Sequence, residues 1–413
     1  MRQSQLFTKT SKTISQEEVS VNAQLLLRGG FIDKLFAGVY TMLPLGFRVL
    51  TKIETIIREE MNRVGGQEVL MPALNPKENW VVTGRWDTFD VLFKLTGSGD
   101  KEYALGASHE EVVTPLVQKF VFSYKDLPQA VYQMQTKFRN EARAKSGILR
   151  GREFRMKDLY SFHHNQQNLD EYYERMIEAY FRVYTRCGIR EKTYLTFASG
   201  GTFSKYSHEY QTITEAGEDS IYICDTCNIA FNSEIIEDVN HACNQCQNKE
   251  LREAKAIEVG NIFKLGTKYS APFGFSYSDE NNNQQPVIMG CYGIGSSRVM
   301  GTVVEIHHDE KGILWPEEIA PYSLHLVSLC QEPDHIQQAE VLYEQLVAKG
   351  IDVLFDDRPD VRAGEKFADS DLLGIPTRVV VSAKTLAQQS VEIKKRSSED
   401  SDFKSIISFL AEV

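Results

Sequence analysis

The amino-acid sequence predicts an α+β protein with two domains, an antiparallel sheet in the first and a compact α/β fold in the second. Three observations predict this class. Phe138–Glu141 alternates as on a strand, and a turn at Ser146 and Gly147 can return the chain antiparallel through Arg150–Phe154. The segment Trp315–Pro321 has the composition of a linker. After it, strand and helix patterns alternate, which indicates an α/β domain with a largely parallel sheet.

Composition is ordinary for a soluble protein. The chain has 413 residues, of which 42% are hydrophobic and 25% charged, and its formal net charge is −11. This length provides for two or three domains. No apolar run approaches the roughly 20 residues that a membrane helix needs, and the polar N-terminus lacks a signal core. We therefore expect a cytoplasmic enzyme without membrane association. The acidic total does not exclude RNA, because RNA binding depends on local patches.

The N-terminal half contains one long helical pattern that starts near residue 47. Its apolar stripe consists of Val49, Ile53, Ile56, Ile57, Met61 and Val64, and charged residues occupy the other face. Gly65 and Gly66 can end the helix, and Gln67–Pro72 reads as a strand that the proline terminates. By periodicity alone, this is an amphipathic helix packed on a sheet.

Ser108 and Glu110 allow two interpretations. A serine two residues before a glutamate can offer a hydroxyl and a carboxylate to a cation from one side of an extended turn. Alternatively, Ser108 is the N-cap of a helix and forms a capping box with Glu111. Spacing alone favours the cap, and both interpretations can hold if Glu110 faces a pocket.

The stretch Lys137–Lys157 reverses the charge of this acidic chain. It holds eight basic residues, which are Lys137, Arg139, Arg143, Lys145, Arg150, Arg152, Arg155 and Lys157, against Glu141 and Glu153. Clustered guanidinium groups bind phosphate oxygens bidentately, so the stretch predicts a polyanion site. A charge run by itself is more often a solvated basic face.

Two CxxC pairs follow a helical pattern at Leu169–Cys187 and a loop that leads to His208. Fifteen residues separate the pairs, which are Cys224 with Cys227 and Cys243 with Cys246. Each pair can present two thiolates, so the pattern predicts a tetrahedral structural zinc site with no open position for substrate. The alternative is buried free cysteines or an altered metal site. A lone histidine such as His208 is usually structural.

A glycine-rich run, Val287–Met300, precedes the second domain. Its GxxGxG spacing is not the GxGxxG of dinucleotide sites. Glycines let a ligand approach the backbone, and Arg298, which opens the next helix, can bind a phosphate. In the second domain, the strands are expected at 324–329, 351–355 and 377–382 and the helices at 335–349 and 366–373.

The strand, loop and returning strand that carry Arg139, Glu141, Arg150 and Phe154 resemble motif 2 of the class II aminoacyl-tRNA synthetases. The resemblance implies that Arg139 binds the α-phosphate of ATP and that Glu141 reads the adenine amino group. It also implies that Phe154 stacks on adenine and that Arg150 reaches toward the outer phosphates.

Two further segments resemble motifs of this class. Residues 47–72 resemble motif 1, which implies a homodimer. The glycine-rich run resembles motif 3, which implies that Arg298 binds the γ-phosphate; Ser297 stands where an apolar residue is expected. Arg139 and Arg298 are the expected catalytic residues, and Mg²⁺ is expected to bridge the phosphates of ATP. The ATP-binding residues that the resemblance implies are Arg139, Glu141, Arg150, Phe154, Gln211, Ser296 and Arg298.

Within this class, the chain is similar to the bacterial-type prolyl-tRNA synthetases. Tyr103–Glu111 resembles their Thr-x-Glu loop, with Ser108 in place of threonine, which implies that Ser108 and Glu110 bind the ammonium of proline. The Ser-His-Glu-Tyr element implies that His208 contacts proline. The proline-binding residues that the resemblance implies are Ser108, Glu110, Arg139, Phe162 and His208.

The resemblance divides the chain into a catalytic domain, residues 1–315, and an anticodon-binding domain, residues 316–413. Bacterial-type prolyl enzymes usually carry a large editing domain between motifs 2 and 3. Here, residues 221–256 with the cysteine pairs stand in its place and leave no room for a domain of ordinary size. We therefore expect a short form without editing in cis. The second domain has four charged residues that could contact anticodon bases, and one or two of them are expected to do so. These residues are Asp357, Arg358, Arg362 and Lys366.

The expected activity is ATP-dependent ligation of L-proline to tRNA(Pro) through a prolyl-adenylate, so the expected partners are tRNA(Pro), L-proline and ATP. One alternative is a catalytically inactive synthetase paralog with a regulatory or RNA-binding role. Such paralogs typically lose motif arginines, whereas Arg139 and Arg298 are both present. A second alternative is a different class IIa enzyme such as threonyl-tRNA synthetase. That enzyme would need a metal-binding amino-acid pocket, which the sequence does not show near motif 2.

Overall fold

The computed structural model describes residues 1–13, 18–201, 203 and 206–413 and divides the chain into two compact units. The terminal unit comprises residues 1–34, 41–52 and 303–413, and the central unit comprises residues 35–40 and 53–302. Among the described residues, no helix has the length and the apolar character that crossing a membrane requires.

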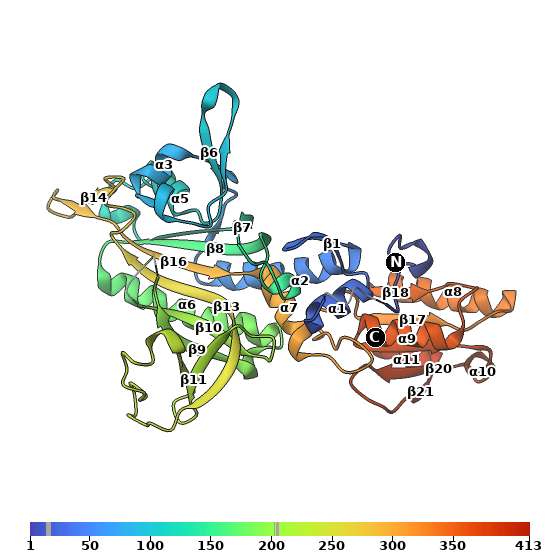
Figure 1. The fold of residues 1–413 in the computed structure, drawn as a ribbon. Helices are drawn as coiled ribbons and strands as arrows, with labels where there is room; N and C mark the ends of the chain where they lie inside the picture. The colour runs from blue at the N-terminus through green and yellow to red at the C-terminus, as the bar shows by residue number, and fades with distance from the viewer. Residues whose placement is uncertain (14–17, 202, 204–205) are drawn as a thin grey trace. The chain divides into compact units, whose positions relative to one another are not determined.

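The central unit is built on a sheet of nine strands, counted over the described residues, in the order β10-β9-β12-β11-β13-β16-β8-β7-β3 (Figure 1). The strands are β3 (Gln67–Glu68), β7 (Gln129–Phe138), β8 (Glu153–His163), β9 (Thr193–Ser199), β10 (Tyr206–Ile213), β11 (Asp219–Cys224), β12 (Ile229–Asn232), β13 (Arg252–Gly266) and β16 (Ile288–Ile294). Only β9 with β12 and β3 with β7 pair parallel among these described strands. The predicted antiparallel sheet is therefore confirmed.

The β7–β8 hairpin carries most of the basic stretch. Its pairing ends at Phe138 opposite Glu153, so the predicted strand over residues 138–141 is wrong. Arg139 and the residues after it belong to a loop, because the chain turns at once, with the N–H of Glu141 donating to the carbonyl of Arg139 at 2.7 Å. The predicted turn is present: Ser146 and Gly147 both adopt a left-handed conformation, with φ of 61° and 63°.

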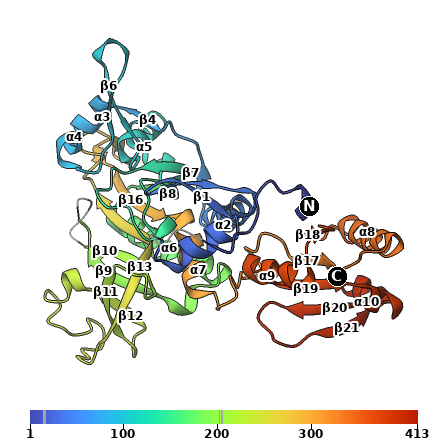
Figure 2. The ribbon, with the colours of Figure 1, turned by 45° about the vertical axis from the view of Figure 1, so that its right-hand side comes forward.

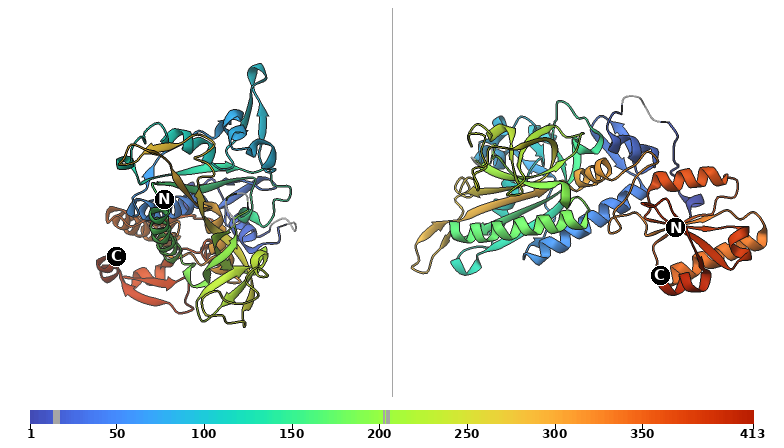
Figure 3. Two further views of the ribbon diagram at one scale, coloured as in Figure 1. Left: turned by 90° about the vertical axis from the view of Figure 1, so that its left-hand side faces the viewer. Right: turned by 90° about the horizontal axis from the view of Figure 1, so that it is seen from below.

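Helix α6 (Gln166–Arg186) packs on one face of this sheet (Figure 1). Its apolar side, which the sequence predicts, is buried and consists of Tyr172, Met176, Ala179, Tyr180, Val183 and Tyr184. The second half of α2 (Pro44–Arg63) runs beside it (Figure 3, right). There Arg182 Nε donates to the buried carboxylate of Glu60 at 2.7 Å. The predicted stripe of α2 is buried throughout, which confirms the amphipathic helix.

A small lobe stands on the central sheet (Figure 1). It consists of β4 (Leu74–Pro76), α3 (Lys77–Val82), α4 (Arg85–Thr88), β5 (Lys94–Thr96), β6 (Glu102–Leu105) and α5 (Glu110–Val117). Trp80 and Trp86 are its largest core residues. The capping box predicted for Ser108 is not formed, because α5 begins at Glu110 with His109 as its N-cap. The predicted strand at 67–72 is limited to β3. A hairpin of β14 (Ser276–Ser278) and β15 (Gln284–Pro286) and helix α7 (Ser296–Ile306) complete this part of the chain.

The terminal unit contains a sheet whose described strands have the order β18-β17-β19-β20-β21 (Figure 2). Its elements are β17 (Leu324–Ser328), α8 (Pro333–Ala348), β18 (Val353–Asp356), α9 (Ala363–Leu373), β19 (Thr377–Val381), α10 (Ala383–Ala387), β20 (Ser390–Lys395), β21 (Asp402–Ser405) and α11 (Ile406–Glu412). The predicted alternation up to β19 is confirmed. β20 and β21 were not predicted, and they pair antiparallel, so the sheet is mixed. The chain also forms α1 (Val21–Arg28), β1 (Ile32–Phe36) and β2 (Val39–Met42).

Candidate functional site

Two adjoining cavities lie in the central unit against β7, β8, β13 and β16. The first encloses about 230 Å³ and the second about 200 Å³, and both are walled by Arg139, Glu258 and Arg298. Strand β8 contributes alternate side chains to the first cavity, because successive residues of a strand point to opposite faces. These side chains are Phe154, Met156, Asp158 and Tyr160.

The shared wall brings two arginines together. Arg298 Nε donates to the carbonyl of Leu149 at 2.8 Å, and its Nη1 donates to that of Glu258 at 2.8 Å. The Arg139 guanidinium lies 5.3 Å from the centre of the Phe154 ring, and its buried Nε has no hydrogen-bond partner among the described residues. Burial and then the neighbouring Arg298 lower the pKa of Arg139. Two guanidinium groups in one wall repel each other, so the wall favours an anion.

The second cavity is lined by further charged residues of the basic loop. Arg150 Nη2 lies 2.9 Å from Glu141 Oε2, and its Nη1 lies 2.9 Å from Glu218 Oε2. Burial opposes the charge of Arg150, but its hydrogen bonds to the two glutamates raise its pKa. The structure thus places Glu141 and Arg150 beside the shared arginine wall, as an elongated ligand that spans both cavities would require.

One side of the first cavity holds a buried carboxylate. Glu110 is 0% exposed and opens α5. Its Oε2 accepts a hydrogen bond from Ser108 Oγ, and its Oε1 accepts one from Cys291 Sγ at 3.1 Å. A buried carboxylate is stable only with a cationic or hydrogen-bonding partner, so this side of the cavity suits a cationic group of a ligand.

A second buried pair lies beside Glu110. Lys137 Nζ is 2.8 Å from Asp158 Oδ1 and 2.6 Å from His109 Nδ1. Burial would raise the pKa of Asp158, but Lys137 more than offsets this and the pKa is lowered. Burial and Lys137 lower the pKa of His109 to about 4, so its imidazole is neutral, with Nε2 donating to the carbonyl of Pro72 at 3.1 Å. Lys137 and Asp158 neutralise each other, which leaves the charge of Glu110 for other partners.

Four residues expected at the site do not line either cavity, and three of them are buried. Phe162 is fully buried in the hydrophobic core. Ser296 is buried and its Oγ donates to Glu54 at 3.0 Å. Gln211 is buried and its Nε2 donates at 2.7 Å to Asp219, which lines the second cavity. These residues lie behind the cavity walls or beside them.

His208 lines a different cavity, of about 360 Å³, next to the cysteine loop. Its Nδ1 lies 2.8 Å from Tyr173 Oη, and its ring centre is 4.5 Å from that of Phe197. The adjacent Glu209 accepts a hydrogen bond from Asn261 in the wall of the first cavity, so His208 points to the other face of β10. The structure therefore places His208 away from Glu110.

The four cysteines of the CxxC pairs converge. Their Sγ atoms lie within 4.8 Å of one another, and those of Cys224 and Cys246 are 3.6 Å apart. All four are free thiols. Four thiolates at about 2.3 Å from a tetrahedral zinc ion would have their sulfur atoms about 3.8 Å apart. The geometry therefore fits a zinc ion.

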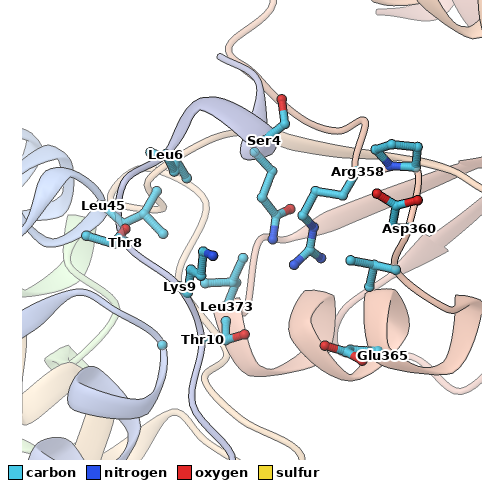
Figure 4. Close-up of a pocket in the computed structure, with 14 residues that line it drawn as sticks. Ser4, Leu6, Thr8, Lys9, Thr10, Leu45, Arg358, Asp360, Glu365 and Leu373 are labelled. Carbon is cyan, nitrogen blue, oxygen red and sulfur yellow. The ribbon is translucent and has the colours of Figure 1, made fainter.

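A further cavity, of about 410 Å³, lies in the terminal unit between the N-terminal residues and the loop after β18 (Figure 4). Arg358 lines it, but the charge of this arginine is matched by Asp356 and Asp369 at 2.7 and 2.9 Å. The buried Lys366 donates to a backbone carbonyl at 2.6 Å. Both cations are therefore paired within the unit, whereas Arg362 is exposed.

Sequence reasoning missed two residues that line the first cavity, Glu258 and Cys291. It also missed Arg85, whose Nη1 lies 3.5 Å from Glu110 Oε2. Glu258 lies between Ile257 and Val259, so a single charged residue within an apolar strand was the signal that could have marked it as a site residue. No spacing motif marks Arg85 or connects it to Glu110, since their contact depends on the fold.

Two family descriptions match the chain. Residues 93–307 match "tRNA synthetase class II core domain (G, H, P, S and T)", and residues 324–413 match "Anticodon binding domain".

Curated relatives match over nearly the whole chain. A "Proline--tRNA ligase" of Syntrophus aciditrophicus is 34% identical and covers 96% of this chain and 94% of its own length. One of Bacillus licheniformis is 34% identical and covers 97% of this chain and 96% of its own length. The first alignment extends over 549 positions, whereas this chain has 413 residues, so that relative contains a long segment with no counterpart here.

Solved structures share the fold. "Giardia lamblia Prolyl-tRNA synthetase in complex with prolyl-adenylate" superposes with a TM-score of 0.79 at 18% identity, covering 94% of this chain and 75% of that one. The "Prolyl-tRNA Synthetase from Cryptosporidium parvum complexed with L-Proline and AMP" gives a TM-score of 0.76 at 16% identity, covering 95% and 73%. At these identities, the likeness concerns the fold alone.

Proposed function

Since this chain belongs to the class II aminoacyl-tRNA synthetases and, among them, to the proline--tRNA ligases, we propose that its two adjoining cavities bind proline and ATP. The activity of the family is the ATP-dependent ligation of L-proline to tRNA(Pro) through a prolyl-adenylate, and it is the activity of this chain. One observation carries the site assignment. Arg139 and Arg298 meet in the wall that both cavities share, and Ser108 and Glu110 line the first of them.

ATP is proposed to lie across the shared wall. Arg139 would bind the α-phosphate and Arg298 the γ-phosphate, because clustered guanidinium groups are the strongest phosphate ligands that a protein offers. Phe154, which lines the first cavity, would stack on adenine, and Glu141, which lines the second, would accept a hydrogen bond from the adenine amino group. Arg150 would give up part of its pairing with Glu141 and Glu218 to reach the outer phosphates. Arg139 Nε is buried and has no hydrogen-bond partner within the described part of the chain, which supports this assignment.

Proline is proposed to occupy the first cavity with its ammonium on Glu110 and Ser108. Phe203 and Phe263 line the same cavity, with ring centres 4.7 Å apart, and offer an apolar wall to the pyrrolidine ring. This orientation directs the proline carboxylate toward Arg139. That arginine would then contact both substrates.

Chemistry at this site requires no side-chain nucleophile. The proline carboxylate attacks the α-phosphate, pyrophosphate leaves, and a ribose hydroxyl of the tRNA terminus then attacks the adenylate. Alignment of the reactants and the positive charges of Arg139 and Arg298 supply the acceleration, since charge develops on the phosphate oxygens in the transition state.

Magnesium is the divalent ion that such phosphates carry. Carboxylate oxygens are its preferred protein ligands, and Glu258 and Asp219 both line the second cavity, so the donor set fits. Burial raises the pKa of Asp219. A bound cation would counteract this effect and hold the carboxylate ionised.

The cysteine cluster is proposed to hold structural zinc. The ligands would be Cys224, Cys227, Cys243 and Cys246, whose Sγ positions fit a tetrahedral ion. Four thiolates leave no open coordination position, so the ion would stabilise the loop and take no part in the chemistry.

Indirect roles are proposed for the residues behind the walls. Gln211 would orient Asp219, and Ser296 would orient Glu54, which holds Arg155 at 2.9 Å. Phe162 and His208 would support the site through packing, Phe162 in the core beside β16 and His208 against α6.

The remaining assignments follow from family membership. We propose a homodimer that works in the cytoplasm, with a catalytic domain at residues 1–315 and an anticodon-binding domain at residues 316–413. The exposed Arg362 is the candidate for contact with the anticodon. The short loop of residues 221–256 would replace an editing domain.

The alternative raised by the sequence was a catalytically inactive paralog. The presence of both cavity arginines and of Glu110 argues against it.

Amino-acid-dependent exchange of labelled pyrophosphate into ATP tests the proposed function. The purified chain is expected to catalyse exchange with proline and not with threonine, serine, glycine or histidine. Exchange with another of these amino acids would assign a different substrate. No exchange with any of them, under conditions where the chain is folded and binds tRNA(Pro), would show an inactive paralog.

A further inference from the structure

Arg85 is a buried cation next to the first cavity that the reaction as described above does not use. It opens α4, and its side chain is 6% exposed. Nη1 donates to both carboxylate oxygens of Glu111, at 2.9 and 3.1 Å, and lies 3.5 Å from Glu110 Oε2. One guanidinium therefore faces two consecutive glutamates.

Aromatic rings enclose this guanidinium. Its Cζ lies 4.4, 5.0, 5.2 and 5.6 Å from the ring centres of Phe89, Phe203, Trp80 and Tyr269. Nε and Nη2 are buried with no hydrogen-bond partner among the residues that the structure describes. Burying a charged group without a full set of hydrogen bonds costs free energy, so packing alone does not explain an arginine at this position.

The charge balance around Glu110 explains the position. Glu110 and Glu111 are both 0% exposed and would carry two negative charges side by side. The nearby Lys137 and Asp158 neutralise each other, and Arg139 faces the shared wall. Burial raises the pKa of Glu111 to about 7, although Arg85 acts in the opposite direction. When both glutamates are ionised, Arg85 brings the net charge of this cluster to −1, which a substrate ammonium neutralises. Without Arg85, two adjacent buried carboxylates would share a proton, as like charges that close cannot both remain ionised.

We propose that Arg85 is a positioning residue for proline: by neutralising Glu111, it keeps Glu110 ionised and available to the substrate ammonium. The inference rests on the proposed function, which puts the ammonium on Glu110. Arg85 would act through the two glutamates and would not touch the substrate, and only the amino-acid side of the reaction would depend on it.

The test is a double-mutant cycle in proline-dependent pyrophosphate exchange. Arg85→Met should raise KM for proline about 10- to 100-fold, because one carboxylate then takes up a proton. Glu111→Gln should also raise it, because Arg85 would then pair with Glu110 and compete with the ammonium. The double variant Arg85→Met/Glu111→Gln restores the net charge of −1 around Glu110, so its KM for proline should fall below that of Arg85→Met. KM for ATP should change by less than about twofold in all three.

Arg182→Met is the matched control, since Arg182 also pairs with a buried glutamate, Glu60, away from both cavities. It should leave KM for proline unchanged. If the losses of the two single variants add in the double variant, Arg85 serves packing only and the inference is wrong. If Arg85→Met does not fold, Arg85→Lys decides: it retains the charge and should keep KM for proline within about twofold of the starting protein, whereas a large increase overturns the inference. Absence of exchange in the unaltered chain would instead reject the proposed function.

Discussion

Arg139 and Arg298 determine the electrostatics of the cavity wall. The two positive charges repel each other. Glu258 Oε2 lies 3.3 Å from Arg298 Nη1 and compensates the charge of Arg298 but not that of Arg139. The Nε of Arg139 is buried with no partner among the described residues. A triphosphate would satisfy both arginines, so the wall favours an anion.

Replacing Arg298 by alanine should therefore impair use of ATP. We expect kcat/KM for ATP in proline-dependent exchange to fall roughly 100- to 1000-fold, the effect typical of removing one group that stabilises transition-state charge. KM for proline should change little, since Arg298 bonds to Leu149 and Glu258 and, among the described residues, forms no bond with Glu110.

Arg252→Ala provides the control at the residue scale. Arg252 pairs with Asp225 at 2.9 Å, and its side chain is 46% exposed, outside both cavities. Its removal should leave exchange unaffected. An Arg298→Ala variant with kinetics like those of Arg252→Ala would contradict the ATP assignment.

At the scale of single elements, the alternation of strand β10 determines which residues reach the site. His208 and Tyr210 face α6, and Tyr210 packs there against Tyr180 with ring centres 4.9 Å apart. Glu209 faces the cavity side. Because both faces of this strand are covered, the sequence contains no hydrophobic alternation that reveals the phase, and His208 could not be placed from it.

The close approach of α6 to β13 requires a glycine. A Cβ at Gly260 would lie 2.3 Å from Tyr184 Oη, so any larger residue would push the helix from the sheet. Gly260 also lines the first cavity, so the shape of the site depends on how α6 packs against β13.

The cysteine loop is predicted to be an element that a metal stabilises. The purified chain should contain one zinc ion per chain by elemental analysis, and Cys243→Ser should lose it. Without the metal, the loop retains only a small hydrophobic cluster, so thermal unfolding should begin at a lower temperature.

Proline-dependent exchange at low temperature should survive loss of the zinc, because the cysteines lie outside the walls of both cavities. A chain that contains no metal and is equally stable with and without chelator would show that the cysteines are plain thiols.

At the scale of the whole molecule, the missing segment has a functional consequence. Alanine differs from proline by the loss of methylene groups, and a pocket rejects a smaller substrate by only about 1–3 kcal/mol for each missing methylene. The chain should therefore form alanyl-tRNA(Pro) slowly and leave it intact. Charging with labelled alanine checks the first step, and incubation of preformed alanyl-tRNA(Pro) checks the second.

The control is the same alanyl-tRNA(Pro) without enzyme, which reports spontaneous hydrolysis. Rapid deacylation by the purified chain alone would show that a hydrolytic site exists within these 413 residues. Hydrolysis equal to the control would agree with correction in trans or with tolerance of the error.

The sequence by itself determined the features that depend on short spacing. Turn residues marked the β7–β8 hairpin, apolar stripes marked α2 and α6, and two CxxC pairs marked the cysteine cluster. These features involve neighbours in sequence, whose geometry follows from backbone conformation and periodicity.

Only the tertiary structure decided which distant residues share a wall. It brought Glu258 to Arg298, placed Arg85 against Glu110 and Glu111, and turned His208 away from the cavity. The physical reason is that these contacts depend on strand order, on which face of a strand is covered and on burial, and neither composition nor spacing encodes them for residues far apart in the chain.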